Sequence, residues 1–182
     1  MKRRLFAAIS VAALAIAAFA AGSNPVVGGQ EMYPTKNIIE NAINSADHTT
    51  LVAAVKAAGL VETLEGPGPF TVFAPTNEAF DKLPAGTVDT LLKPENKALL
   101  TKILTYHVVA GRLSAHDLMK MIKEGNGKAE LTTVEGGKLW AMEDGKKIVL
   151  KDEKGGMATV TIANVFQSNG VIHVIDAVLM PN

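Results

Sequence analysis

One short segment places a serine, a histidine and an aspartate close together, Ser114-Ala-His116-Asp117. These side-chain types can supply the nucleophile, base and orienting acid of acyl transfer. In the first turn of a helix, however, neighbours at this spacing point to different sides. A serine followed three residues later by an acidic residue is typical of a capped helix start. We therefore expect a cap and no enzyme activity; an enzyme would need a polar pocket around two or more of Ser114, His116, His107 and Asp176.

The side chains that hold metal ions and cofactors are sparse in this chain, which has four histidines and no cysteine. Neither a His-x-x-x-His spacing nor a carboxylate pair at ligand spacing occurs, so we predict no metal site. His173 stands in an apolar run, where a hydrogen-bonded core histidine is expected. The glycine-lysine stretches 125–128 and 136–138 lack the spacing of a phosphate-binding loop, and turn geometry accounts for both. We expect no cofactor.

Tyr106 and His107 are the one pair of side chains that we keep as candidate functional residues. Apolar residues four apart predict a helix that ends at this pair. There a tyrosine can bury its ring and use its hydroxyl, and a cationic histidine would suit the helix dipole. The primary role we expect is to lock helix to sheet, and a contact role would require part of the segment to be exposed. The candidate interaction residues are Tyr106, His107, Ile103, Leu104, Val108 and Val109.

Two apolar segments near opposite ends of the chain are predicted to form the sheet that positions this pair. Residues 70–73 form a short strand stopped by Pro75, which cannot donate to a sheet ladder. An Asn-Gly turn at residues 169–170 leads into a nearly unbroken apolar strand, residues 171–179, with both faces expected to be buried. Helices come first and strands dominate from residue 129 onward, which indicates an α+β fold.

These segments, together with the Tyr-His pair, resemble the three signature boxes of fasciclin (FAS1) domains. The boxes are Phe70–Phe80, Leu100–Val109 and Asn169–Pro181, in the family's order and at about its spacing. The resemblance covers nearly all of the chain after residue 36 and shows no internal repeat. It implies one FAS1 domain with a β-rich wedge or sandwich, on which N-terminal and intervening helices pack.

The resemblance also bears on partners. In some animal members the Tyr-His box and its branched neighbours are implicated in cell adhesion through integrins. Some of those members carry an Asp-Ile pair a few residues before the Asn-Gly turn, whereas this chain has Asn164-Val165 there. Because no carboxylate at that position can reach a receptor's metal ion, an integrin partner is not implied.

The start of the chain predicts a cleaved export signal over residues 1–20. Basic residues 2–4 precede an apolar run of 15 residues, and Ala18-Phe19-Ala20 fits the cleavage pattern. An uncleaved anchor is disfavoured because a membrane span needs about 20 residues. Residues 21–36 are predicted to be a flexible tether, and residues 37–182 the FAS1 domain.

Charge and hydropathy narrow the partners further. The full chain has 18 basic and 18 acidic residues, and three of the basic residues lie in the export signal. The mature chain therefore has a net charge near −3. This balance disfavours nucleic acid and strong attraction to anionic lipid. No later stretch is long and apolar enough to span a membrane, so we expect a secreted or periplasmic protein.

The resulting hypothesis is a non-catalytic adhesion or binding module, whose partner is an unknown protein or polysaccharide at a cell surface or matrix. The alternative is a periplasmic carrier of a small apolar ligand, with Met119 and Met121 lining an adaptable cavity. Trp140, on a strand beside the Asp144-Gly145 hairpin, is either a core residue or an exposed contact, and the sequence leaves both open.

Overall fold

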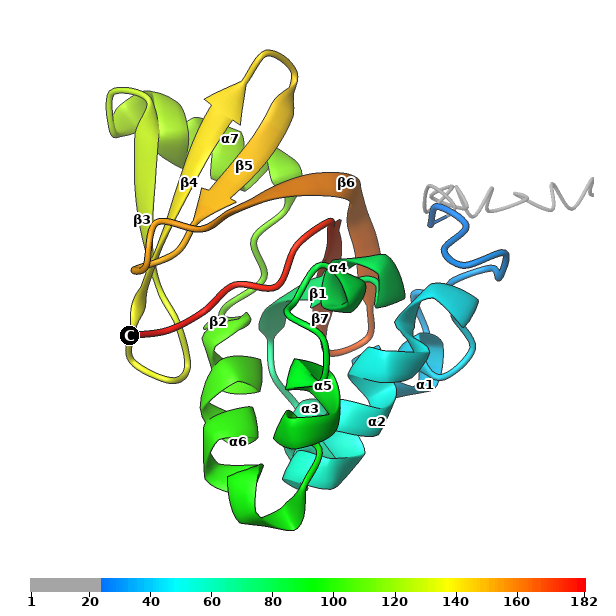
Figure 1. Cartoon of the computed structure of the whole chain (residues 1–182). Coiled ribbons are helices and arrows are strands. Elements are labelled where there is room, and N and C mark those ends of the chain that lie inside the picture. Colours follow the sequence, from blue (N-terminus) through cyan, green and yellow to red (C-terminus); the bar gives the residue numbers. More distant parts are fainter. Residues whose placement is uncertain (1–23) are drawn as a thin grey trace, which may run out of the picture.

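The computed structural model describes residues 24–182, so the predicted export signal lies outside the described residues. In the described part of the chain, one twisted sheet and the helices that cover it form a wedge with two halves (Figure 1). No helix within residues 24–182 is long and apolar enough to cross a membrane.

Seven strands make one sheet: β1 Phe70–Pro75, β2 Val108–Ala110, β3 Lys128–Thr132, β4 Lys138–Asp144, β5 Lys147–Lys151, β6 Met157–Gln167 and β7 Gly170–Ile175. Their order is β2-β1-β7-β6-β5-β4-β3, and only β1 and β7 pair in parallel. Shifts in register on both sides of Ile162 bend β6, which carries the sheet from one half to the other (Figure 1). The Val134 N–H donates to the Val108 carbonyl at 2.8 Å, so the two edges meet and the sheet nearly closes.

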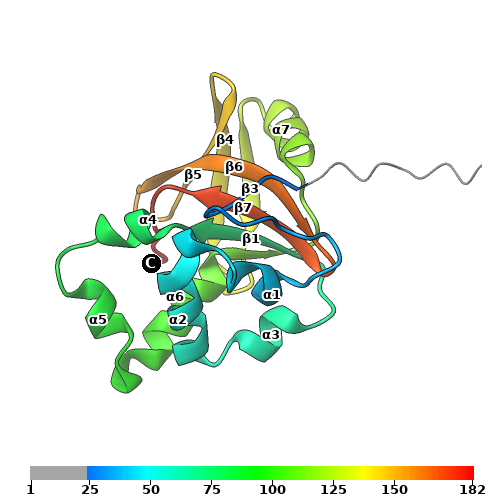
Figure 2. The same cartoon turned by 90° about the vertical axis from the view of Figure 1, so that its right-hand side faces the viewer.

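The helices divide between the two halves. They are α1 Ile38–Ala42, α2 Thr49–Ala58, α3 Val61–Glu65, α4 Asn77–Asp81, α5 Thr87–Leu91, α6 Lys97–Tyr106 and α7 Ala115–Glu124, with short 3-10 turns at Ala46–His48 and Pro94–Asn96. Figure 2 shows α1, α2, α3 and α6 on one side of β1 and β7, and α7 beyond the opposite side beside β3 and β4. The predicted cap at Ser114 is confirmed, because its Oγ accepts the Asp117 N–H at 3.2 Å at the start of α7.

Each half has its own apolar core. Val72 on β1 and Val174 on the neighbouring β7 belong to the core under the first six helices. The second core lies between α7 and the strands β3 to β6, where buried residues alternate with exposed ones along β3 and with half-buried ones along the first part of β4. The predicted α+β wedge is confirmed, and the structure adds that the two apolar strands, β1 and β7, pair in parallel at its centre.

The last strand is shorter than the sequence predicts. It ends at Ile175 rather than at residue 179. The Asp176 N–H still donates to the Thr159 carbonyl at 3.2 Å, but the Thr159 N–H donates to the Asp176 carboxylate at 2.7 Å in place of a backbone carbonyl, and the strand pairing ends there. Residues 176–182, here named the C-terminal strap, continue without strand pairing between the two halves (Figure 1).

The predicted tether over residues 21–36 also differs from the structure in its described part. Val27 and Met32 are only 4% and 5% exposed and join the helical core. The Asn24 side chain donates to the Phe166 carbonyl at 2.6 Å and accepts the Phe166 N–H at 2.9 Å. From Asn24 onward this segment is therefore packed on the domain, because it supplies apolar side chains and an amide that completes the backbone hydrogen bonding of β6.

Candidate functional site

The Tyr-His box lies where α6 ends and β2 begins. Tyr106 is the last residue of α6 and His107 is its C-cap. All six candidate interaction residues are buried, with exposed fractions from 0% to 6%: Ile103, Leu104, Tyr106, His107, Val108 and Val109. These six side chains offer almost no exposed surface, so a partner cannot contact them in this structure. The box instead connects parts of the chain that are distant in sequence.

Tyr106 joins α6 to the strands of the other half. Its hydroxyl donates to the Lys138 carbonyl at 2.6 Å and accepts the Glu153 N–H at 3.1 Å. Burial raises the pKa of Tyr106 to about 12, so the hydroxyl keeps its proton and its donor role at all physiological pH values. The hydrogen-bonded, buried tyrosine that the sequence predicts is therefore present.

His107 holds the C-terminal strap. Its Nε2 accepts the Leu179 N–H at 3.0 Å, which assigns the ring proton to Nδ1, and Nδ1 lies 2.8 Å from the Ile103 carbonyl. Complete burial lowers the pKa of His107 to about 4. The expectation of a cationic histidine is wrong. The neutral ring satisfies a carbonyl of its own helix by hydrogen bonding and leaves Nε2 free to accept from the strap.

Further side chains fasten the strap along its length. The Asp152 carboxylate accepts the Met180 N–H at 2.9 Å, and the Glu153 carboxylate accepts the Asn182 N–H at 3.2 Å. Lys82 Nζ donates to the Asp176 carbonyl at 2.6 Å. Since these partners come from both halves, the strap and the Tyr-His box together fix how the two halves are joined.

His173 is the hydrogen-bonded core residue that the sequence predicts. It lies on β7 with no exposed surface, and its ring is stacked 5.8 Å from that of Phe73. Its Nε2 lies 2.8 Å from the Leu113 carbonyl, and its Nδ1 accepts the Asn164 N–H at 3.3 Å. Because Nδ1 is an acceptor, the ring proton belongs on Nε2, and burial lowers the pKa of His173.

The serine, histidine and aspartate of the predicted cap do not form a catalytic arrangement. Ser114 Oγ donates to the Asp117 carboxylate at 2.7 Å, so its proton is used within the capping box. His116 is exposed on α7. Within residues 24–182 no group of three or more histidine, aspartate or glutamate side chains has a geometry that could hold a metal ion.

An apolar cavity of about 60 Å³ lies between β1 and the helices α1, α2, α3 and α6. His48 lines it, is 3% exposed, and bonds through Nδ1 to Ser45 Oγ at 2.8 Å. Its Nε2 has no hydrogen-bond partner among the described residues, and burial lowers the pKa of this histidine. Met119 and Met121, which the carrier hypothesis placed at such a cavity, instead pack against the core under α7.

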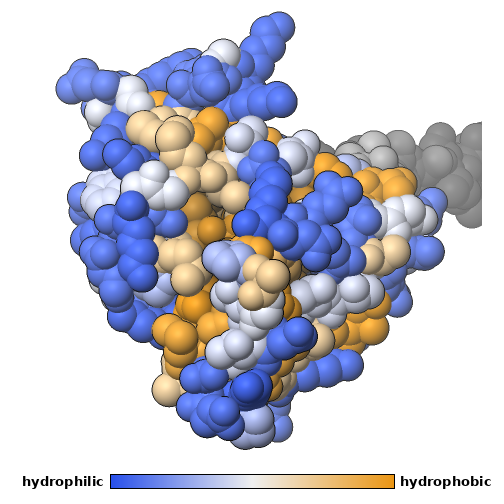
Figure 3. Space-filling model, in the orientation of Figure 1, coloured by the Kyte–Doolittle hydropathy of each residue, from blue (hydrophilic) through white to orange (hydrophobic). Residues whose placement is uncertain are grey.

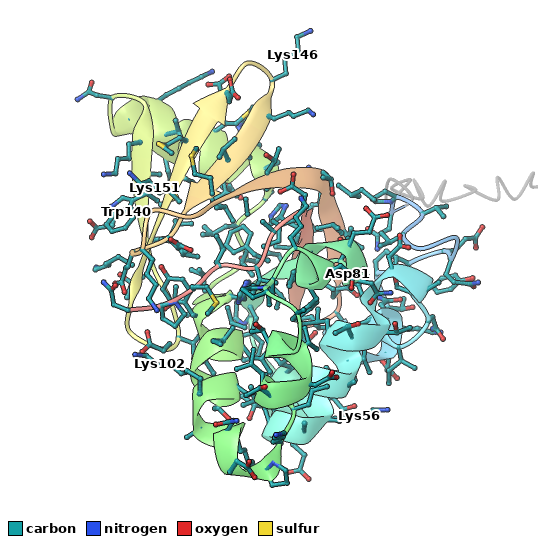
Figure 4. The ribbon with its side chains drawn as sticks, viewed as in Figure 1. Lys56, Asp81, Lys102, Trp140, Lys146 and Lys151 are labelled. Carbon is teal, nitrogen blue, oxygen red and sulfur yellow. The ribbon has the colours of Figure 1, made fainter. Side chains whose placement is uncertain are left out.

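Trp140 lies on the outward face of the sheet, which α7 leaves uncovered. It is half-buried on β4, and the ammonium of Lys128 lies 4.8 Å from the centre of its ring. Beside it, Lys138 Nζ and the Glu130 carboxylate form an ion pair at 3.0 Å. Figure 4 shows Trp140 and Lys151 next to each other at the outer side of these strands. In the sequence, Leu139 and Ala141 alternate with Lys138, Trp140 and Met142, and this period of two could have indicated the outward position of Trp140.

Charged and apolar side chains are mixed on this side of the molecule. Figure 3 shows hydrophobic surface running down its middle between hydrophilic margins, from the strands β4 and β5 toward the helical half. The exposed apolar residues of the chain include Met157 on β6, which is 57% exposed, and Leu99 on α6, which is 48% exposed. These side chains, unlike the Tyr-His box, can meet a partner.

Comparison with known proteins shows which proteins this chain is similar to. A family model described as "Fasciclin domain" matches residues 46–181. The chain is 46% identical to Protein sll1483 of Synechocystis sp., over 96% of this chain and 97% of that protein. It is 36% identical to Immunogenic protein MPB70 of Mycobacterium bovis, over 97% of this chain and 93% of that protein.

A solved structure has the same fold. It is a FAS1 domain pair from the insect cell adhesion molecule Fasciclin I, which matches with a TM-score of 0.70 at 20% sequence identity. The match covers 80% of this chain and 51% of that one.

Proposed function

Since this chain belongs to the fasciclin family, we propose that it is a non-catalytic binding module, exported to the periplasm or beyond the cell, that contacts a cell surface, a matrix or an envelope protein. The insect protein of like fold is described as a cell adhesion molecule. The export pattern of residues 1–20 supports a place outside the cytoplasm.

The burial of the Tyr-His box is the observation that carries this proposal. The titratable side chains of the box, Tyr106 and His107, are buried. Their hydrogen bonds go to backbone groups of the protein, so neither is available to a substrate. Exposed apolar and charged side chains, among them Met157 and Lys128, lie instead on the outward face of the sheet. Such surfaces are suited to binding rather than to catalysis.

Attachment of the source cells tests the proposal. Deleting the gene should reduce attachment to surfaces or biofilm formation, and a plasmid copy should restore it. A copy that lacks residues 1–20 is the matched control, since the same domain would then stay inside the cell and should not restore attachment. Unchanged attachment of the deletion strain under all conditions would contradict an adhesive role.

The apolar cavity favours a second candidate, a carrier of a small apolar ligand. Its volume of about 60 Å³ offers room for a few water-sized groups, and its lining is almost wholly apolar. Native mass spectrometry of protein purified from its own envelope should then show retained mass. A Val55→Phe variant, which fills the cavity, should lose that mass; a protein that carries none would rule out this candidate.

A further inference from the structure

We propose that the outward face of strands β3 to β6 is a binding surface for an acidic polysaccharide. The inference rests on the proposed function, because it names the surface and the class of partner of the same binding module. Three observations support it: the register of the strands, the position of the single tryptophan, and the charges around it.

The register places one row of side chains straight across the sheet. Four residues in register form this row, one from each strand from β3 to β6: Glu130, Trp140, Lys151 and Met157. Neighbouring strands lie about 4.8 Å apart, so the row presents one side chain at each such step. That step is similar to the rise of one sugar ring in an extended polysaccharide. A linear polymer laid along the row would therefore meet a different side chain with each ring.

Trp140 supplies a flat apolar surface in the middle of the row. It is the only tryptophan in the chain, and a half-buried tryptophan is anchored well enough to act as a binding hot spot. The C–H faces of pyranose rings stack on such indole rings. The Lys128 ammonium now interacts with the ring, and because Lys128 is exposed, moving it onto a ligand carboxylate costs little.

The charges around Trp140 fit a polymer that carries both carboxylates and hydroxyls. This face carries four lysines and two carboxylates. The lysines are Lys128, Lys138, Lys147 and Lys151, and the carboxylates are those of Glu130 and Asp144. Lys138 is held by Glu130 and by the Thr132 hydroxyl, so Lys128, Lys147 and Lys151 would pair with spaced carboxylates of the polymer. Glu130 would accept hydroxyl hydrogens of the polymer. A densely phosphorylated partner such as nucleic acid or an anionic membrane would bring phosphates against the two carboxylates, whereas a uronic acid polymer also carries hydroxyls that can meet them. The mixed face therefore favours a uronic acid polymer.

The test uses the mature chain and polygalacturonate as the acidic polymer, with dextran as its neutral counterpart. Biolayer interferometry on immobilised polymer measures affinity, and Trp140 fluorescence reports contact at the site, because no other tryptophan contributes. We expect saturable binding of polygalacturonate with a shift of the Trp140 spectrum, and no binding of dextran.

Three variants locate the site. Trp140→Leu should weaken binding about tenfold or more, and Lys151→Glu should weaken it about fivefold or more. Lys56→Glu, the matched control, makes the same charge change on α2, in the helical half and far from Trp140 (Figure 4). It should change affinity less than about twofold. If Trp140→Leu fails to fold, Lys151→Glu carries the test, because Lys151 is exposed.

Several outcomes would overturn the inference. They are a wild-type protein that does not bind polygalacturonate, an effect of Lys56→Glu equal to that of Lys151→Glu, and tighter Trp140-dependent binding to DNA or to phosphatidylglycerol vesicles. The two proposals fail separately. Binding with unchanged attachment of the deletion strain would refute adhesion alone, and reduced attachment without polymer binding would refute the polysaccharide surface alone.

Discussion

Replacing His107 by glutamine should make the protein less sensitive to mild acid. The buried ring has a pKa of about 4, whereas the unfolded chain has an ordinary histidine pKa near 6.5. A histidine whose pKa is lowered in the folded state stabilises it above pH 6.5. That contribution is lost as the pH falls toward 4, because the unfolded chain takes up a proton that the folded chain refuses. Glutamine removes the titration and retains an acceptor for the Leu179 N–H.

The two pKa values set the size of the effect. Between pH 7.5 and pH 5.0 they give a loss of about 2 kcal/mol in the free energy of unfolding of the wild type through His107 alone. The lowered pKa values of His48 and His173 add losses of the same sign. Since those two histidines are present in both proteins, the difference between wild type and His107→Gln isolates the contribution of His107.

Urea unfolding followed by Trp140 fluorescence at the two pH values measures this difference. The wild-type midpoint should fall by about 1 M more than that of His107→Gln. His116→Gln, at an exposed histidine, is the matched control and should behave as the wild type does. Equal losses in the wild type and in His107→Gln would refute the reasoning, since they would mean that His107 binds its proton equally in both states.

Three further substitutions test other parts of the structure, each by urea unfolding at pH 7.5. Tyr106→Phe should lower the free energy of unfolding by about 1–2 kcal/mol, because it leaves the half-buried Glu153 N–H without its acceptor; no loss would show that water replaces the hydroxyl. Ser114→Ala should cost about 1 kcal/mol through loss of the α7 cap, and a loss several times larger would indicate a role beyond capping. Gly170→Ala should cost more than about 2 kcal/mol, since a Cβ there would overlap the Phe70 carbonyl; a neutral effect would mean that β1 and β7 can move apart.

Patterns among residues close in sequence predicted several features of the fold. The capped start of α7 and the hairpin at Asp144-Gly145 both depend on residues close in sequence. Such features need no knowledge of distant parts of the chain, and the structure has them where the sequence predicts them. The strand after the Asn-Gly turn was predicted too long, because its end depends on Asp176 bonding to Thr159, which lies 17 residues away.

The sequence by itself determined the α+β class and the two apolar strands that meet as β1 and β7, and it singled out the Tyr106-His107 pair at the end of α6. Only the tertiary structure decided which way these side chains face and what charge they carry. His107 is neutral because its partner, Leu179, comes from 72 residues away and seals it from water. Trp140 faces outward because α7 covers the opposite side of its strand. The burial of a side chain and its hydrogen-bond partners depend on contacts between residues that are distant in sequence. A local sequence pattern does not specify those contacts.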